Sequence, residues 1–306
     1  MTRIISLLGK LSVAAFIVAS ASVASAQHPF KSPEDAAAAL ASAVKDNWPK
    51  GVLAVLGAEG ADIVSSGDQV ADEAMRQKFL AAWDAKHQLT REGDDKAVMV
   101  IGNEDFPFPI QLTRKGAAWQ FDTAAGRLEI LYRRIGRNEL NAIQACLAYV
   151  DAQNEYADKN RAGAGGAAYA QRIVSRPGKK DGLYWPAAQG EQESPLGELV
   201  AKASTEGYAV DGDRVPFHGY YYKILTRQGP MAAGGEVDYV VRGKMIGGFA
   251  LVAYPAEYGN SGVMTFVVNY AGTVFQKDLG ERTAKIAERM TSFNPDQTWK
   301  KVEVAK

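Results

Sequence analysis

Cysteine and histidine are nearly missing from this sequence. Its 306 residues include one cysteine, Cys146, and three histidines, His28, His87 and His218. One cysteine cannot form an intramolecular disulfide, and no histidine or cysteine pair has the spacing of a usual zinc site. Cys146 lies in an apolar helical pattern, which favours a buried structural thiol. We therefore expect no metal and no cofactor, and a fold stabilised by apolar burial.

The motifs of common enzyme and nucleotide-binding classes are also missing. Gly259-Asn260-Ser261-Gly262 is one residue short of a nucleophile elbow, which favours a turn. The glycine-rich residues 161–168 lack the strand and the Gly-Lys-Ser/Thr of a phosphate loop, and they predict a flexible connection. The 35 Lys+Arg and 35 Asp+Glu residues are mixed along the chain, without the basic stripe of a nucleic-acid-binding protein. The sequence therefore predicts no catalytic residue and no nucleic-acid partner.

What the chain does have, at its start, is the pattern of a secretory signal peptide. Arg3 and Lys10 make a basic start, residues 11–19 are apolar, and Ala24-Ser25-Ala26 is a small-x-small cleavage site. No later stretch reaches the roughly 18 apolar residues that a transmembrane helix needs. We expect cleavage after Ala26 and a mature chain in the periplasm or outside the cell, with no transmembrane segment.

Helical and strand-like periodicities alternate along the mature chain. Ser32 and Pro33 have the residue types of an N-cap and a first helical position, and Asp68 or Asp72 can cap a later helix. Residues 96–102, 107–115 and 117–124 then show the period of strands. This order predicts a first domain, residues 27–126, in which helices pack on a curved antiparallel sheet.

A second domain, residues 127–306, is predicted from the rest of the chain. Its long helical tract, Arg127 to Lys159, contains Gly136 as a site where the helix can break. The alternation of strands is clearest over Tyr220–Leu225 and Met264–Asn269. The fold class is therefore α+β, with the long helix packed on a second antiparallel sheet.

Several strings resemble known families. The ending GAAWQFDTAAG of the first domain is similar to the last strands of nuclear transport factor 2-like domains. The helix end AYVDAQNEYA, with GYYYKIL and GFALVAYPAEYGNSGVMTFVVNYAGTVFQKDLG, resembles the globular part of type IV pilins and type II secretion pseudopilins. Here the helix lies in the middle of the chain, so the resemblance implies a pilin-like fold used for another purpose.

The mature chain as a whole resembles one further group. The strings SSGDQVAD, FPFPI, RRIGRNEL, GLYWP and SPLG are similar to those of bacterial exported proteins grouped as domain of unknown function 2950. This resemblance implies an envelope protein without an established activity, and it supplies no catalytic residues.

The stretch GLYWP, residues 182–186, is the first candidate for a binding site. Tyrosine and tryptophan offer large contact areas at low entropic cost. We favour the structural alternative, in which Trp185 covers the second sheet and the loop packs on its own side chains. As a ligand or partner surface, the site would comprise Asp181, Tyr184, Trp185, Ser194, His218, Tyr220 and Tyr222.

The string YRRIGRNEL is the second candidate. Arg133 and Arg137 are four residues apart, as are Arg134 and Asn138, and Glu139 follows directly. Arginines at helical spacing can bind an anion or pair with carboxylates. Because this tract joins the two domains, we favour a network of ion pairs that fixes their angle, with a small anion site as the alternative.

Together these features predict an exported envelope protein that is a non-enzymatic binding or adaptor module, whose partners are envelope proteins or a small ligand. One alternative is a small-ligand binder or hydrolase that uses His218 near the Gly182–Pro186 loop, with Asp181 or Glu193 as the carboxylate. Another is an accessory component of a pilus or type II secretion-like assembly.

Overall fold

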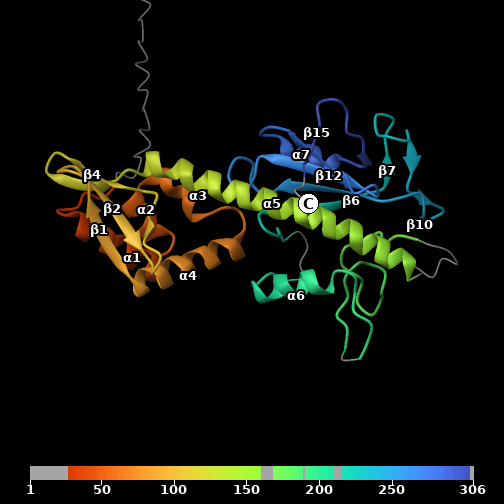
Figure 1. Cartoon of the computed structure of the whole chain (residues 1–306), viewed down its shortest axis with the longest axis horizontal. Helices are drawn as coiled ribbons and strands as arrows, with labels where there is room; N and C mark the ends of the chain where they lie inside the picture. Colours follow the sequence, from red (N-terminus) through yellow and green to blue (C-terminus); the bar gives the residue numbers. More distant parts are fainter. Residues whose placement is uncertain (1–26, 160–167, 189, 210–214, 304–306) are drawn as a thin grey trace, which may run out of the picture.

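The computed structural model describes residues 27–159, 168–188, 190–209 and 215–303. The molecule is elongated, with one sheet towards each end and the long helix α5 (Thr123–Asp158) running between them (Figure 1). The helices and antiparallel sheets confirm the predicted α+β class. Except for Ala168, the glycine-rich connection at 161–168 lies outside the described residues.

The N-terminal unit begins with helices whose ends are encoded locally. Ser32 Oγ accepts the backbone N–H of Asp35 at 3.0 Å, and Pro33 follows as the first helical residue, as predicted. Asp68 caps a later helix through the N–H of Ala71 at 3.0 Å. The helices are α1 (Pro33–Asp46), α2 (Lys50–Leu56), the 3-10 turn η1 (Ala58–Gly60), α3 (Ala61–Val64) and α4 (Gln69–Ala85).

These helices pack on an antiparallel sheet that contains one strand the sequence did not predict. In strand β1 only Leu89 is partly buried, so the apolar alternation is weak; the strand forms because it pairs with β2, Leu89 opposite Met99. The buried core between helices and sheet includes Leu40, Ile110 and Phe121. The described strands are β1 (His87–Arg91), β2 (Lys96–Ile101), β3 (Phe106–Pro107), β4 (Leu112–Lys115) and β5 (Ala118–Phe121), in the order β1-β2-β4-β5 with β3 on β2.

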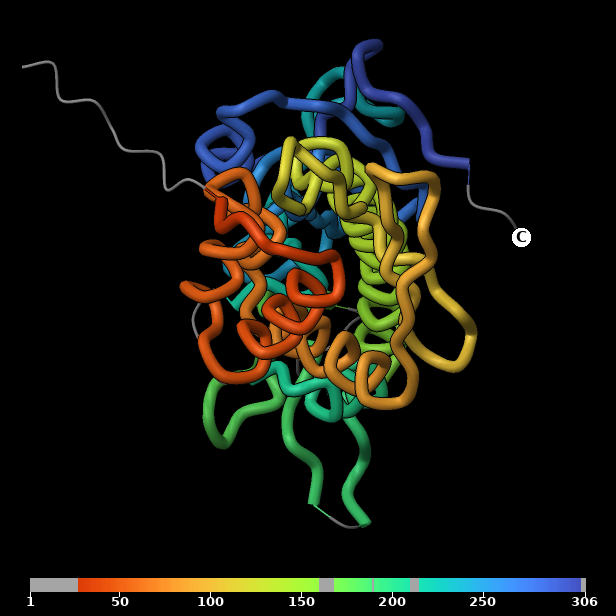
Figure 2. The backbone as a smooth tube through the Cα atoms, turned by 90° about the vertical axis from the view of Figure 1, so that its left-hand side faces the viewer, coloured from red at the N-terminus to blue at the C-terminus, as the bar shows by residue number. Residues whose placement is uncertain are grey.

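Helix α5 belongs to both units. It contains 36 residues, which corresponds to a length of about 54 Å at 1.5 Å per residue. The break predicted at Gly136 is wrong: the helix continues through it, because packing on both sides outweighs the modest helix-breaking tendency of one glycine. Figure 2 views the molecule from the N-terminal end, with α1 and α2 in front and α5 running away from the viewer.

The two glycines of α5 are expected to respond in opposite ways to alanine. A Cβ at Gly126 would lie 2.6 Å from Cα of Ile110 and 2.7 Å from the carbonyl oxygen of Pro109, so Gly126→Ala should destabilise the fold by about 1–3 kcal/mol. A Cβ at Gly136 meets no described atom within 4 Å, so Gly136→Ala should stabilise it by about 0.5–1 kcal/mol. Urea unfolding of both variants measures this, and equal effects would contradict the packing of α5 against residues 109–110.

The C-terminal unit packs the second half of α5 on another antiparallel sheet. Its strands occur in the order β15-β13-β12-β11-β6, and Ala253 lies opposite Tyr222 on one side and Phe266 on the other. Cys146 is 0% exposed, and burial raises the pKa of its thiol to about 12, which confirms a structural role. The strands are β6 (Tyr220–Leu225), β11 (Ala250–Pro255), β12 (Met264–Asn269), β13 (Val274–Asp278) and β15 (Lys300–Lys301).

Shorter elements surround this sheet. In both overall views, residues 186–188 and 190–193 extend away from the body of the molecule (Figures 1 and 2). None of the helices in the described ranges has the length and apolar character to cross a membrane. The remaining elements are α6 (Gly197–Thr205), α7 (Thr283–Arg289), the strands β7 (Arg227–Gln228), β8 (Val237–Asp238) and β14 (Ser292–Phe293), and the hairpin of β9 (Val240–Val241) and β10 (Lys244–Met245).

Candidate functional site

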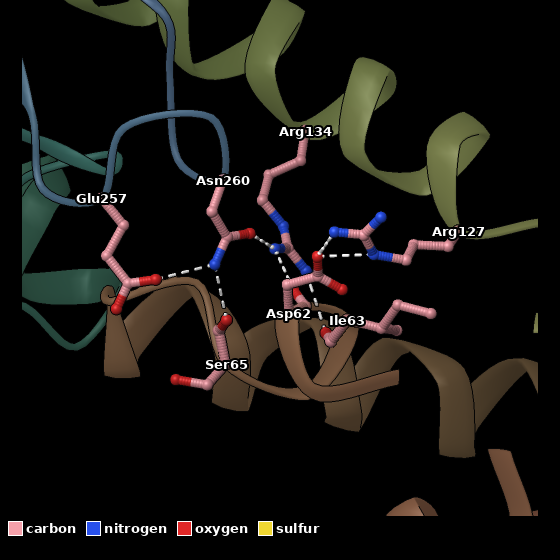
Figure 3. A network of polar contacts seen from close by, with 7 residues as sticks. All are labelled: Asp62, Ile63, Ser65, Arg127, Arg134, Glu257 and Asn260. Carbon is pink, nitrogen blue, oxygen red and sulfur yellow. Dashed lines mark hydrogen bonds and ion pairs between the residues drawn. The ribbon is translucent and has the colours of Figure 1, made fainter. Parts of the chain in front are cut away.

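The two units meet where the first half of α5 passes α3 and the loop between β11 and β12; we refer to this contact as the junction (Figure 3). Arg134 points into it from α5 and is 9% exposed. Its Nη1 donates to the carbonyl oxygen of Asp62 at 2.6 Å and to Oδ1 of Asn260 at 2.5 Å. Its Nη2 donates to the carbonyl oxygen of Ile63 at 2.9 Å. One guanidinium therefore links α5 to both units.

Asn260 makes a second set of contacts across the junction. Its Nδ2 donates to the carbonyl oxygen of Ser65 and to Oε2 of Glu257, both at 2.8 Å (Figure 3). The last carbonyl groups of a helix have no partner within that helix. At the end of α3, the side chains of Arg134 and Asn260 supply the missing donors. The sequence pattern identified Asn260 only as part of a turn, because its partners are far away along the chain.

Asp68 connects the junction to the segment that precedes β6. Its side chain is buried, with 1% exposure, and its Oδ2 accepts the hydroxyl of Tyr208 at 2.9 Å and the N–H of Gly219 at 2.8 Å. These partners are 140 and 151 residues away in the sequence. The sequence offered Asp68 or Asp72 as the cap of this helix and gave no sign of these two bonds.

Burial controls the ionisation of charged groups at the junction. It lowers the pKa of the Arg134 guanidinium, against the attraction of Asp72 and Asp62. It raises the pKa of Asp72, against two hydrogen bonds from the hydroxyl and N–H of Ser66 at 2.7 and 2.9 Å. Since these groups are engaged with protein partners, we interpret the junction as a structural connection.

The predicted arginine network is divided between different faces of α5. Arg134 lies in the junction, whereas Arg133 is exposed and its Nε pairs with Oε1 of Glu129 at 2.7 Å. Arg137 is exposed. Glu139 accepts two backbone N–H groups at the start of β12, both at 3.0 Å. Of the four predicted residues, Arg134 and Glu139 thus contact the C-terminal unit, and they do so through polar groups other than each other.

His218 lies next to Tyr208, close to the junction. It has a positive φ of 50°, and its Nε2 lies 3.5 Å from Oε2 of Glu206. Burial lowers the pKa of His218, and the nearby carboxylate of Glu206 opposes this shift. The carboxylate that approaches its ring is therefore that of Glu206, in place of the Asp181 or Glu193 suggested by the sequence.

The lowered pKa predicts how stability depends on pH. Because folded His218 binds a proton less readily than unfolded His218, the free energy of unfolding should fall as the pH decreases through and below the ordinary value of 6.5. His218→Gln should reduce this fall between about pH 7 and pH 5. Urea unfolding of both proteins across this range measures the difference. Identical pH profiles would contradict the burial of His218 as a neutral ring.

The residues of the predicted aromatic surface occupy different environments. Trp185 is 4% exposed and packs in the core of the C-terminal unit with Leu183 and Leu196. Lys180 lies over its ring, with Nζ 5.6 Å from the ring centroid. The structure therefore places Trp185 below the surface and leaves only part of the predicted set accessible. Two further members of the set are buried, Tyr220 and Ser194. The others are half-buried: Tyr184, Tyr222, His218 and Asp181. Of these, Asp181 lines a groove on the surface.

This groove, which we call the basic groove, lies at the C-terminal end of α5 and has a volume of about 710 Å³. It forms where the last turns of α5, residues 168–181 and the β9–β10 hairpin meet. The charged residues among its described lining are Arg172, Arg176, Lys179, Lys180, Lys244 and Asp181. The sequence pattern missed it because Lys244 is more than sixty residues from the other cations along the chain.

Comparison with known proteins gives one finding. A family model described as "Protein of unknown function (DUF2950)" matches residues 27–302. No curated protein and no solved structure matches the chain.

Proposed function

Because the chain belongs to the family described as "Protein of unknown function (DUF2950)", we propose a function from its own geometry: it is an exported, non-enzymatic binding protein of the cell envelope, and its ligand occupies the basic groove. The resemblance to exported proteins and the signal-peptide pattern of residues 1–26 support the location.

The observation that carries this proposal is the construction of the basic groove. Its walls come from three parts of the chain, and Gln153 of α5 fixes the wall formed by residues 168–181 at Ala170. The Gln153 side chain accepts the N–H of Ala170 and donates to its carbonyl oxygen, both at 2.8 Å. Concave sites with convergent polar groups on a rigid frame are typical of ligand-binding sites.

A thermal-shift screen of the protein, purified after expression of the full chain, tests this function. The panel should include organic acids, phosphates, sugars, peptides and metal ions, and hydrogen exchange should then map each hit. We expect a stabilising ligand that protects residues 168–181 and 243–245. Protection restricted to another region would refute the assignment to the groove.

Mass spectrometry of the exported protein should give an N-terminus at Gln27.

A hydrolase that uses His218 is a second candidate, favoured by the 3.5 Å approach of its Nε2 to Glu206. A histidine paired with a carboxylate can act as a general base. Hydrolysis of ester and amide model substrates that is lost in His218→Gln but kept in Arg172→Ala would favour this candidate over the binding protein.

A further inference from the structure

We propose that the basic groove binds phosphate groups, and that Arg172 and Lys179 are the residues that hold them. This inference rests on the binding function proposed above and adds the chemical class of the ligand. The lining of the groove is unusually rich in positive charge. The whole chain has equal numbers of cationic and acidic residues, 35 each, whereas the described lining has five cationic residues and one acidic residue.

Ion pairs within the protein engage some of these cations and leave others available. Arg176 is held by Asp181, with Nε 2.5 Å from Oδ2. Lys180 lies 3.6 Å from Oε2 of Glu191. Among the described residues, no carboxylate lies within ion-pair distance of Arg172 or Lys179. Asp181 is paired with Arg176, and its pKa is lowered, against desolvation, by Arg176 and by the nearby Arg172. Both are exposed, so a ligand can reach them without breaking an existing pair.

Backbone contacts fix the segment that carries Arg172 and Lys179. At its start, the N–H of Tyr169 donates to the carbonyl oxygen of Met245 at 2.8 Å, and Nε2 of Gln171 donates to that of Gly243 at 2.8 Å. At its end, the hydroxyl of Tyr156 in α5 donates to the carbonyl oxygen of Lys180 at 3.0 Å. The backbone that carries the cations is therefore positioned before a ligand arrives, which reduces the entropic cost of binding.

The side chains favour phosphate over a single carboxylate. Arginine binds phosphate oxygens through two parallel N–H donors. The lysine ammonium group can form an ion pair with a second anionic oxygen of the same ligand. Arg172 and Lys179 line the same groove, and its volume of about 710 Å³ leaves space for more than one phosphate group. The phosphate can belong to a soluble polyanion or to a lipid headgroup, and the experiment below distinguishes these sources.

Calorimetric titration with inorganic tripolyphosphate and co-sedimentation with phosphatidylglycerol vesicles test the inference. We expect at least one probe to bind the unaltered protein, and the Arg172→Ala/Lys179→Ala variant to bind it at least about tenfold more weakly. The matched control is Lys285→Ala/Arg289→Ala on α7, which removes one lysine and one arginine from an exposed helix elsewhere. It should bind like the unaltered protein.

The two binding experiments distinguish a soluble phosphate ligand from a lipid headgroup and from no phosphate ligand at all. Tripolyphosphate binding that depends on Arg172 and Lys179 supports a soluble ligand, and vesicle binding alone with the same dependence supports a lipid headgroup. If neither probe binds, or if both double variants weaken binding equally, the inference is overturned. A screening hit of other chemistry that still protects the basic groove would then leave the proposed binding function intact while this inference fails.

Discussion

Replacing Arg134 with alanine is expected to lower the free energy of unfolding by about 3–5 kcal/mol. The change removes the donors for the carbonyl oxygens of Asp62 and Ile63 and for Oδ1 of Asn260, and buried acceptors without partners are costly. It also removes the cation that attracts Asp72. Urea unfolding followed by far-UV circular dichroism measures the loss.

The neighbouring Arg133 is the control for this variant. Its side chain is 52% exposed, and its ion pair with Glu129 is on the surface of α5. Exposed pairs contribute little, so Arg133→Ala should change stability by less than about 1 kcal/mol. Similar losses for Arg133→Ala and Arg134→Ala would show that the junction contacts contribute no more than a surface ion pair.

Trp185→Ala is expected to destabilise the protein by about 3–5 kcal/mol, because it leaves a cavity in the core cluster to which Leu183 and Leu196 also belong. This result would favour the structural interpretation of the GLYWP stretch. Tyr132→Ala is the control, because Tyr132 is also aromatic but is 67% exposed on α5, and its loss should cost no more than about 0.5 kcal/mol.

Ligand binding by the Trp185 variant separates the two interpretations further. Binding should be measured with a ligand found in the screen, at a temperature where the variant is folded. Normal stability together with lost binding would make Trp185 part of the binding site. Reduced stability with retained binding would leave it a core residue beneath the basic groove.

Much of the fold follows from local signals in the sequence. Ser32, Pro33 and Asp68 encode helix starts through contacts with residues at most three positions away, so their roles can be derived without a structure. The strands Tyr220–Leu225 and Met264–Asn269 have the predicted bounds, because their aromatic and β-branched residues mark them as strands. Burial along them does not alternate as expected: every residue of β12 after Met264 is buried. The predicted domain limits and the resemblances to nuclear transport factor 2-like domains and pilins stay predictions.

The junction and the basic groove could not be predicted, because both form through contacts between residues far apart in the sequence. Arg134 stood out in the sequence, but its partner Asn260 is 126 residues away. Lys244 joins Arg172 and Lys179 only because the bridge between Tyr169 and Met245 brings the hairpin to the segment after α5. Trp185 was a surface candidate because its chemical type suits binding, and tertiary packing decides whether such a residue is exposed.

The continuity of α5 also has a mechanical consequence. A force applied at the basic groove would act along one unbroken helix and reach the N-terminal sheet as tension or compression, since no loop lies between them to absorb it. At the junction, Arg134 and Asn260 resist rotation about the helix axis. The chain thus places the basic groove and the N-terminal sheet at opposite ends of one rigid helix about 54 Å long.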